Sequence, residues 1–336
     1  MIHHFLYAGI SLLICIASLG ASTLSDKELL AKQPDPARWF ITDDGKPTKR
    51  LILLLQLDTL YDPNDHLEEI VAKTQKAWVQ TIQGQNNKER TDLQDTAEQE
   101  KKRLETEKIV QEIGLFNART PALKHYQYAA CLGGYVDGVR KGLAELIEAW
   151  QSGIRFDSLI FFTGERYLRK EPGREDSLER LCNPQSSALT IKAGWKMPED
   201  APYETEYDMC KLIWDQTELP EDMRLALGDK VIFVNAARPV GRERPSTKDA
   251  YIAWVKEYNP APGTVLAISH PLLWTYQQIA GENSLGPNYP LDTCAKAVSE
   301  QDRQRHQQRI VSLVQDTAGK CLYELLERQK KEGQRD

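Results

Sequence analysis

Short apolar runs alternate with amphipathic segments between residues 126 and 282, and this alternation is the main structural signal in the chain. Between and after these runs, apolar residues recur every three or four positions, which predicts helices. Alternating strands and helices predict parallel β-α units with helices on both faces of one sheet. The four runs with the length and composition of buried strands are 126–132, 157–163, 230–236 and 264–269.

The helices of this region carry recognisable signals. Thr205 with Asp208, and Ser246 with Asp249, have the spacing of a capping box at a helix start. Pro271 follows the fourth strand, where the first turn of a helix accepts a residue without an N–H group. The last helix is expected to run unbroken from Gln301 to about Lys330. Its buried stripe would consist of Ile310, Leu313, Val314, Thr317, Cys321 and Leu325.

The expected fold class is therefore α/β. It is a Rossmann-like, mostly parallel sheet with helices on both faces, plus a helical N-terminal elaboration and a long C-terminal helix. The α/β domain is expected to cover residues 121–336, after a helical, charged region at 51–120. Within that region, the Leu-rich run at 51–60 favours a buried helix. The polar stretch at 67–113 indicates either a solvated helical hairpin or an arm that binds a protein partner.

The first fifty residues have a different composition. Residues 1–22 contain an apolar run at 5–19 without any charge, followed by small residues. This pattern predicts a secretory signal peptide, with an uncleaved membrane anchor or a buried N-terminal helix as the alternatives. The protein is accordingly expected to be exported, to the periplasm, the cell envelope or the medium, with any membrane association made through its N-terminus. Residues 23–50 are polar and punctuated by proline, and predict a linker.

Composition excludes some function classes. The 336 residues are 41% hydrophobic and 27% charged, as in ordinary globular proteins. A net charge of −6 argues against general nucleic-acid binding. The five cysteines after the leader are scattered and form no C-x-x-C pair, so a structural metal site is not expected. Their odd number allows two disulfides and one thiol but selects no pairing, and Cys131 and Cys210 are expected to be buried.

Positive charge gathers where the predicted strands end. Residues 163–170 carry a net charge of +2 and residues 236–248 a net charge of +3, although the protein as a whole is acidic. Ligands bind at the carboxyl ends of open parallel sheets, where helix N-termini also favour anions. The pattern therefore predicts an anion site at this edge. The alternative is that these arginines are solvated or paired with nearby acids.

The candidate ligand-binding residues follow from this placement: Gly133, Gly134, Arg140, Gly164, Glu165, Arg166, Arg238, Thr247 and Ser269. The three arginines among them would hold the anion, and the glycine turn would donate N–H groups. Glu206 and His270 are the acid/base candidates, with a helix-start carboxylate and a structural histidine as the alternatives. Ser269 beside His270 also suggests a Ser/His hydrolase, although helix capping is the simpler role for this serine. No complete nucleotide-binding motif is present, so the sequence identifies no cofactor.

The order of these segments resembles the SanA/ElyC-like bacterial envelope proteins, a Rossmann-like family of unknown function. The matching stretches are "CLGGYVDGVRKGLAEL", "LIFFTGERYLR", "ETEYDMCKLIW", "RPSTKDAYIAWV" and "VLAISHPLLWTYQQ", within residues 126–282. The chain has Thr-Gly-Glu-Arg where the family usually has Ser-Gly-Gly. The resemblance implies a leader or anchor, an envelope location and no settled reaction. It also implies that Gly133, Gly134 and Arg140 line the first turn and Gly164 the second, and that Glu206, Thr247 and His270 match the family's polar positions.

Taken together, these patterns favour an exported or membrane-anchored envelope protein that binds a phosphate-bearing small molecule, such as a nucleotide, a phosphorylated sugar or a lipid headgroup. On this hypothesis, Arg166→Ala weakens ligand binding without unfolding the protein. A secreted interaction protein that uses residues 67–113 is the second hypothesis, and the Ser/His hydrolase is the third.

Overall fold

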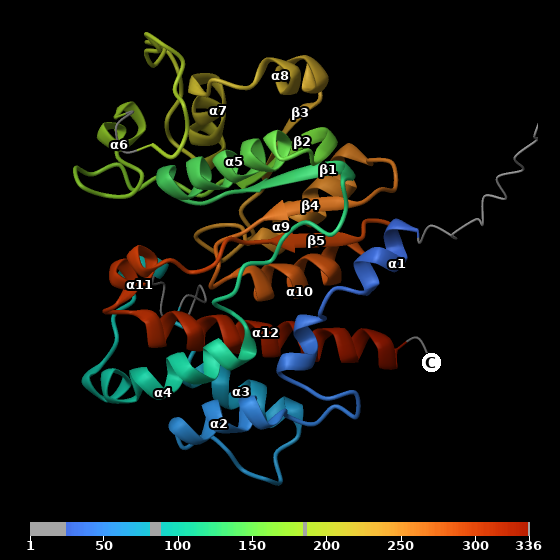
Figure 1. The fold of residues 1–336 in the computed structure, drawn as a ribbon. Helices are drawn as coiled ribbons and strands as arrows, with labels where there is room; N and C mark the ends of the chain where they lie inside the picture. The colour runs from blue at the N-terminus through green and yellow to red at the C-terminus, as the bar shows by residue number, and fades with distance from the viewer. Residues whose placement is uncertain (1–24, 81–88, 184–186, 335–336) are drawn as a thin grey trace, which may run out of the picture.

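Five parallel strands form the centre of the computed structural model, which describes residues 25–80, 89–183 and 187–334. The strands are β1 (His125–Leu132), β2 (Arg155–Gly164), β3 (Val231–Ala236), β4 (Val265–Ile268) and β5 (Leu291–Cys294). They lie in the order β3-β2-β1-β4-β5 (Figure 1). All neighbouring pairs are parallel, so the protein has the predicted Rossmann-like α/β fold.

The four predicted strands are confirmed, whereas β5 was not predicted. Its four residues include Asp292 and Thr293, which are polar but fully buried. Asp292 accepts hydrogen bonds from the Tyr126 hydroxyl (2.5 Å) and the Ala122 N–H (2.8 Å). A short strand with polar residues held by such distant partners has no periodic signal.

Helices cover both faces of the sheet (Figure 1). On one face lie α5 (Val136–Gln151), α7 (Glu206–Gln216) and α8 (Glu221–Leu227), and on the other lie α9 (Thr247–Ala253) and α10 (Trp274–Leu285). A π-helical turn, η4 (Trp254–Tyr258), continues α9, and the short α6 (Leu178–Cys182) precedes α7. The capping boxes predicted at the starts of α7 and α9 are confirmed. Cys131 and Cys210 are buried as expected.

The predicted C-terminal helix is two helices. α11 (Glu300–His306) starts with a capping box formed by Ser299 and Asp302, and α12 (Ile310–Gly333) follows after a break. The predicted buried stripe of α12 is confirmed. The break has a physical cause, because Asp95 from a distant segment accepts hydrogen bonds from the N–H groups of Val311 (3.1 Å) and Ser312 (2.7 Å). These two groups belong to the first turn of a new helix, where no intrahelical partner exists.

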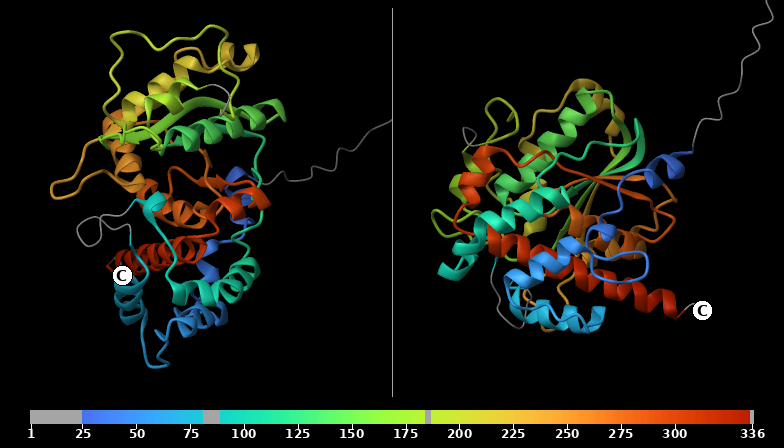
Figure 2. Two further views of the ribbon diagram at one scale, coloured as in Figure 1. Left: turned by 90° about the vertical axis from the view of Figure 1, so that its left-hand side faces the viewer. Right: turned by 60° about the horizontal axis from the view of Figure 1, so that its bottom comes forward.

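α12 lies between the α/β unit and a further layer of helices (Figure 2). That layer contains α2 (Lys49–Leu57), α3 (Leu67–Ala77), the turn η2 (Arg90–Asp92) and α4 (Ala97–Ile113). α2 occupies the run predicted to be a buried helix. The charged stretch is part of this layer, because Ile109, Val110 and Ile113 of α4 are buried in a core shared with α12. The opposite face of α4 is exposed and carries ion pairs such as Lys101–Glu98 (2.6 Å).

The segment expected to be a linker also contributes to this core. It contains α1 (Asp26–Ala31) and the turn η1 (Pro36–Trp39), and Phe40 directly after them is completely buried. The predicted leader, residues 1–22, lies outside the described residues. Among the helices that are described, none is long and apolar enough to cross a membrane.

Candidate functional site

The order of the strands reverses between β1 and β4. The chain moves from β1 outward to β2 and β3, and then returns to place β4 on the other side of β1. In open α/β sheets this switch point leaves a crevice at the carboxyl ends of the strands, where ligands bind. Here the two strand ends lead into Gly133-Gly134 and Ser269-His270.

Gly133 is packed so closely that any side chain at this position would force its neighbours to shift. Its N–H donates to the Phe162 carbonyl of β2 (2.9 Å). A β-carbon at this position would lie 2.7 Å from both Cδ and Oε2 of Glu206, and 2.8 Å from the Phe162 oxygen. A β-carbon at Gly134 would have no neighbouring atom within 4 Å. The turn therefore has one glycine that admits a carboxyl group and one that borders open space.

The helix that follows this turn starts without a side-chain cap from any described residue. Tyr135 is the N-cap of α5 and its side chain makes no capping hydrogen bond. By contrast, α7, α9 and α11 each begin with a complete capping box. The free N–H groups of a first turn and the helix dipole both favour an anion. The start of α5 therefore has the chemistry of an anion site.

Arg166, two residues after the end of β2, points inward and does not form an exposed basic wall. Only 5% of the residue is exposed. Its Nη1 donates to Asp176 Oδ2 (2.7 Å), its Nη2 to the Gly134 carbonyl (2.7 Å), and its Nε to Glu206 Oε1 (3.3 Å). The guanidinium also lies over the Tyr135 ring, 5.0 Å from its centre. The Arg166 guanidinium thus holds the glycine turn and the carboxyl groups of Asp176 and Glu206 in place.

Glu206 is the first residue of α7. An isolated antiparallel bridge between Tyr167 and Thr205 brings the start of α7 beside the exit of β2. The Glu206 N–H then donates to the Arg166 carbonyl (2.9 Å). Burial raises the pKa of Glu206, and the nearby charges of Arg166 and Arg244 only partly offset this effect. The result is a buried carboxyl beside the glycine turn whose pKa lies above its ordinary value.

Sequence reasoning did not identify Glu89, which the helical layer contributes to the same edge. Its Oε2 accepts a hydrogen bond from the Tyr135 hydroxyl (2.9 Å) and pairs with Arg244 (2.9 Å). Burial opposes ionisation of Glu89, but Arg244 and Arg166 outweigh it and lower its pKa. Nearby, Asp92 pairs with Arg169 (2.6 Å). Glu89 lies in a uniformly polar stretch, so no spacing pattern distinguishes it.

Arg140 does not present a free guanidinium at this edge of the sheet. The residue is fully buried on α5. Its guanidinium donates to the carbonyls of Arg180 (2.8 Å) and Leu181 (2.6 Å) and to Gln216 Oε1 (2.8 Å). These contacts tie α6 and α7 to α5. The expectation that Arg140 holds an anion is therefore replaced by a structural role.

Four other predicted site residues lie at or after the ends of β2 and β3. Glu165 accepts a hydrogen bond from the Arg238 N–H (2.9 Å), and the Arg238 guanidinium lies 5.2 Å from the centre of the Tyr167 ring. Gly164 packs against Pro245, which leaves no room for a β-carbon. Thr247 is the first residue of α9, after the Ser246 cap. Of these residues, Arg238 and Glu165 are exposed.

Ser269 and His270 follow β4, but neither side chain hydrogen-bonds the other within the described residues. Ser269 Oγ donates to the His270 carbonyl (3.1 Å), and His270 Nδ1 accepts from the Leu272 N–H (3.3 Å). Burial, helped by the adjacent His306 ring, lowers the pKa of His270 to about 3. Neutral His270 is therefore a hydrogen-bond donor through Nε2 and a weak base. Ser269 does not cap a helix, because α10 begins at Trp274, after a turn that includes Pro271.

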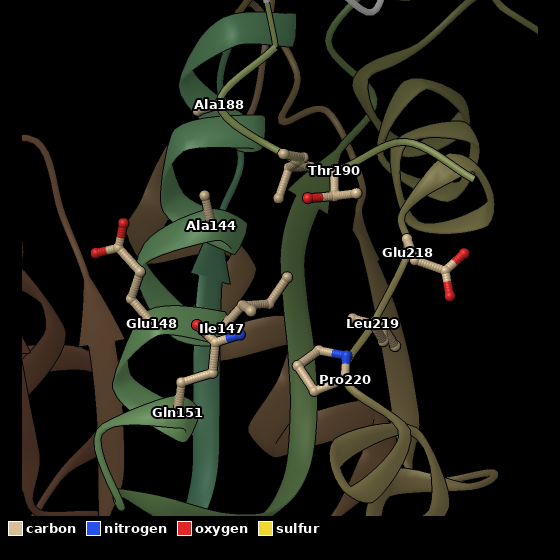
Figure 3. A pocket seen from close by; sticks show the side chains of 10 residues that line it. Ala144, Ile147, Glu148, Gln151, Ala188, Thr190, Glu218, Leu219 and Pro220 are labelled. Carbon is tan, nitrogen blue, oxygen red and sulfur yellow. The ribbon is translucent and has the colours of Figure 1, made fainter. Parts of the chain in front are cut away.

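Two other features of the described residues bear on ligand binding. No group of three or more His, Cys, Asp or Glu residues there is arranged to hold a metal ion. A surface cavity of about 390 Å³ lies between α5 and two loops, with none of the predicted site residues in its lining (Figure 3). Its walls include Ala144, Ile147, Leu189, Thr190, Leu219 and Pro220.

The fold and the reversal of strand order define the class of the protein as a Rossmann-like α/β protein. Comparison with known proteins finds no matching family model, no matching curated protein and no matching solved structure.

Proposed function

We propose that the protein binds a phosphate-bearing small molecule or lipid headgroup at the carboxyl edge of the sheet, between β1 and β4. The observation that carries this proposal is the start of α5, where a glycine turn leads into a helix without a described side-chain cap at the strand-order switch point. The open space at Gly134 would let a phosphate approach the backbone N–H groups.

The proposed role of the arginines differs from the one expected from the sequence. Arg166 and Arg140 use their guanidinium groups for contacts within the protein. In the proposal, Arg166 therefore acts indirectly, by holding the Gly134 carbonyl so that the following N–H groups point to the ligand. Arg166→Ala would leave the buried Asp176 without its partner, so we now expect this change to destabilise the protein.

The test is a thermal-shift screen of the purified chain against inorganic phosphate, nucleotides, sugar phosphates and polyprenyl-phosphate analogues. A ligand present at about 100 times its dissociation constant should stabilise the protein by roughly 2.7 kcal/mol. Gly134→Asp places a carboxylate in the open space at the turn and should abolish the shift through repulsion. Gly134→Ala adds the same β-carbon without charge and should retain it. Equal shifts in both variants would contradict the proposed position of the anion.

Export or membrane anchoring is part of the proposal and rests on the apolar leader within residues 1–22. The resemblance to the SanA/ElyC-like envelope proteins points to the same location. Fusion of residues 1–30 to a reporter that is active only outside the cytoplasm tests this part. A reporter that stays inactive, although the fusion is produced, would refute it.

A further inference from the structure

We propose that the protein forms a two-fold symmetric dimer in which the free edges of β3 from two copies pair as antiparallel strands. The partner is a second copy of this chain, and the contact would join two five-stranded sheets into one. The contact lies at the lateral edge of the sheet, away from the carboxyl ends of the strands. It therefore goes beyond the proposed function and does not depend on it.

β3 and β5 are the two edge strands of the sheet, and β5 is closed by the chain itself (Figure 1). The Gln278 side-chain amide donates to the Leu291 carbonyl (2.9 Å) and accepts from the Thr293 N–H (2.8 Å). Just beyond β5, Arg119 and Ala295 exchange two backbone hydrogen bonds, of 2.8 and 3.1 Å. The outward backbone groups of β5 are thus occupied, and this edge cannot add a further strand.

The outer edge of β3 is open. The Ala236 carbonyl accepts from the chain just after β2, and backbone groups alternate in direction along a strand, so Val231, Phe233 and Asn235 direct theirs away from β2. Within the described residues, the partner of these outward groups is the Tyr258 hydroxyl, which donates to the Phe233 carbonyl (2.9 Å). That carbonyl can accept a second hydrogen bond, and the three outward N–H groups have no described partner.

β3 also lacks the features that usually protect an edge strand. Its sequence, Val-Ile-Phe-Val-Asn-Ala, contains no charge and no proline, and no bulge interrupts its register against β2. Its first three residues are apolar but only half-buried, whereas β5 is buried at every position. Two tyrosines flank the edge, because the Tyr207 ring lies 6.4 Å from the Phe233 ring and Tyr258 is 43% exposed. Tyrosine is enriched at protein interfaces, so this edge has the composition of a contact surface.

Charges at the two ends of β3 favour a second copy as the partner. Asp229 and Lys230 precede the strand, and Glu165 and Arg238 lie where it ends; all four are exposed. None of them forms an ion pair with another described residue. In an antiparallel pair, the start of one strand lies beside the end of the other. Asp229 then meets Arg238, and Lys230 meets Glu165, whereas a parallel pair would bring identical charges together.

The pairing is self-complementary and closes at two copies. With Phe233 on the two-fold axis, Val231 of each copy lies opposite Asn235 of the other, so the outward groups donate and accept reciprocally. Because the β5 edge is occupied, no third copy can add to the sheet. The carboxyl ends of the two sheets point in opposite directions, and both glycine turns lie outside the contact.

Sedimentation velocity of the purified chain over a range of concentrations tests the proposal. The wild-type protein is expected to be a dimer that dissociates on dilution. Val231→Pro removes an N–H that the ladder with β2 does not use, and should raise the dissociation constant by about 10-fold or more. Val231→Thr is the matched control, because it keeps the N–H and the branched side chain; its dissociation constant should change by less than about 3-fold.

A charge exchange tests the antiparallel arrangement with two exposed residues. Arg238→Glu places a second negative charge beside Asp229 of the other copy and should weaken the dimer. Asp229→Lys, added to the same chain, restores opposite charges and should restore the dimer.

Three outcomes would overturn the inference. A monomer at every concentration would show that the open edge is not used between copies. A dimer that Val231→Pro leaves intact would place the contact on another surface. A dimer that Arg238→Glu weakens and the double variant does not restore would refute the antiparallel arrangement. Should Val231→Pro not fold, which circular dichroism shows, the charge exchange decides. Phosphate binding should be equal in monomeric and dimeric variants, so failure of the dimer leaves the proposed function intact.

Discussion

Gly133 and Glu206 are in direct contact, although 72 residues separate them in the sequence: a β-carbon on Gly133 would lie 2.7 Å from two atoms of the Glu206 carboxyl group. The contact joins the turn after β1 to the first residue of α7. It means that the glycine is needed for the approach of a carboxyl group as well as for the shape of a turn.

Gly133→Ala is expected to lower the free energy of unfolding by about 1–3 kcal/mol, as overpacking of a close contact usually does. The added carbon would push against both Glu206 and the Phe162 backbone oxygen, and the latter cannot rotate away. Urea unfolding measures this change. Gly134→Ala is the matched control and should be nearly neutral, since no atom lies within 4 Å of the new carbon.

Asp176→Asn is expected to cost about 3–5 kcal/mol, because it removes the charge that balances the buried guanidinium of Arg166. Asp176 is completely buried, so water cannot replace the carboxylate as a partner of Arg166. Glu98→Gln removes a carboxylate from the exposed Lys101 pair and should change the free energy of unfolding by no more than about 0.5 kcal/mol. Equal effects in chemical denaturation would show that Arg166 does not depend on its buried partner.

His270 should make stability depend on pH on the acid side. Its pKa is about 3 in the folded protein and 6.5 as the ordinary value, so the unfolded state binds more protons between these limits. Its contribution is fully present above about pH 6.5 and is lost as the pH falls toward 3, by up to about 1.4 kcal/mol per pH unit.

His270→Asn keeps an acceptor for the Leu272 N–H but cannot titrate, so unfolding measured from pH 7 to pH 4 should show a shallower loss. His125→Asn, at a half-exposed histidine on β1, serves as the control. A slope unchanged by the His270 substitution would be evidence against this buried neutral histidine.

Arg140→Lys should destabilise the protein by about 1–3 kcal/mol without changing its affinity for phosphate. A lysine ammonium cannot reproduce the fork that contacts the Arg180 and Leu181 carbonyls, and buried acceptors would lose their donors. Calorimetric titration with inorganic phosphate, below the melting temperature of the variant, checks the affinity. A large loss of affinity would restore Arg140 as a ligand-binding residue.

Asp95→Ala should lower the free energy of unfolding by about 1–2 kcal/mol, the usual effect of removing an N-terminal helix cap. Its carboxylate satisfies two N–H groups at the start of α12 from more than 200 residues away. A thermal melt measures this change, and Asp43→Ala, at an exposed partner of Arg38, should have almost no effect in it.

Deleting residues 67–113 would remove Asp95 together with part of the core, so this region cannot serve as a dispensable arm.

The sequence was most informative where regular periodicity and local signals coincide. The four predicted strands, the capping boxes at Thr205 and Ser246, and the buried stripe of α12 are all present. The order of strands and helices along the chain also predicted that basic residues follow the ends of β2 and β3. Such features depend on residues a few positions apart, and local chemistry determines them.

The remaining features depend on partners that are distant in the sequence. The direction of Arg166 is set by Asp176 in an irregular loop, and the role of Glu89 by Tyr135 and Arg244. β5 is short and polar, and its Asp292 is stabilised by Tyr126 on β1. None of these pairs has a spacing that a single sequence can reveal, because each forms only when the whole fold brings its members together.

The central place of α12 has a consequence for the order of biosynthesis. The apolar faces of α3 and α4 are buried against α12, a helix that the ribosome makes roughly 200 residues later, which at 5–20 residues per second is a wait of about 10–40 s. During that interval α2 and α4 can contact each other, but the helix that completes their layer is absent while the strands that follow are already emerging. The helical layer, first in the chain, is therefore last to be completed.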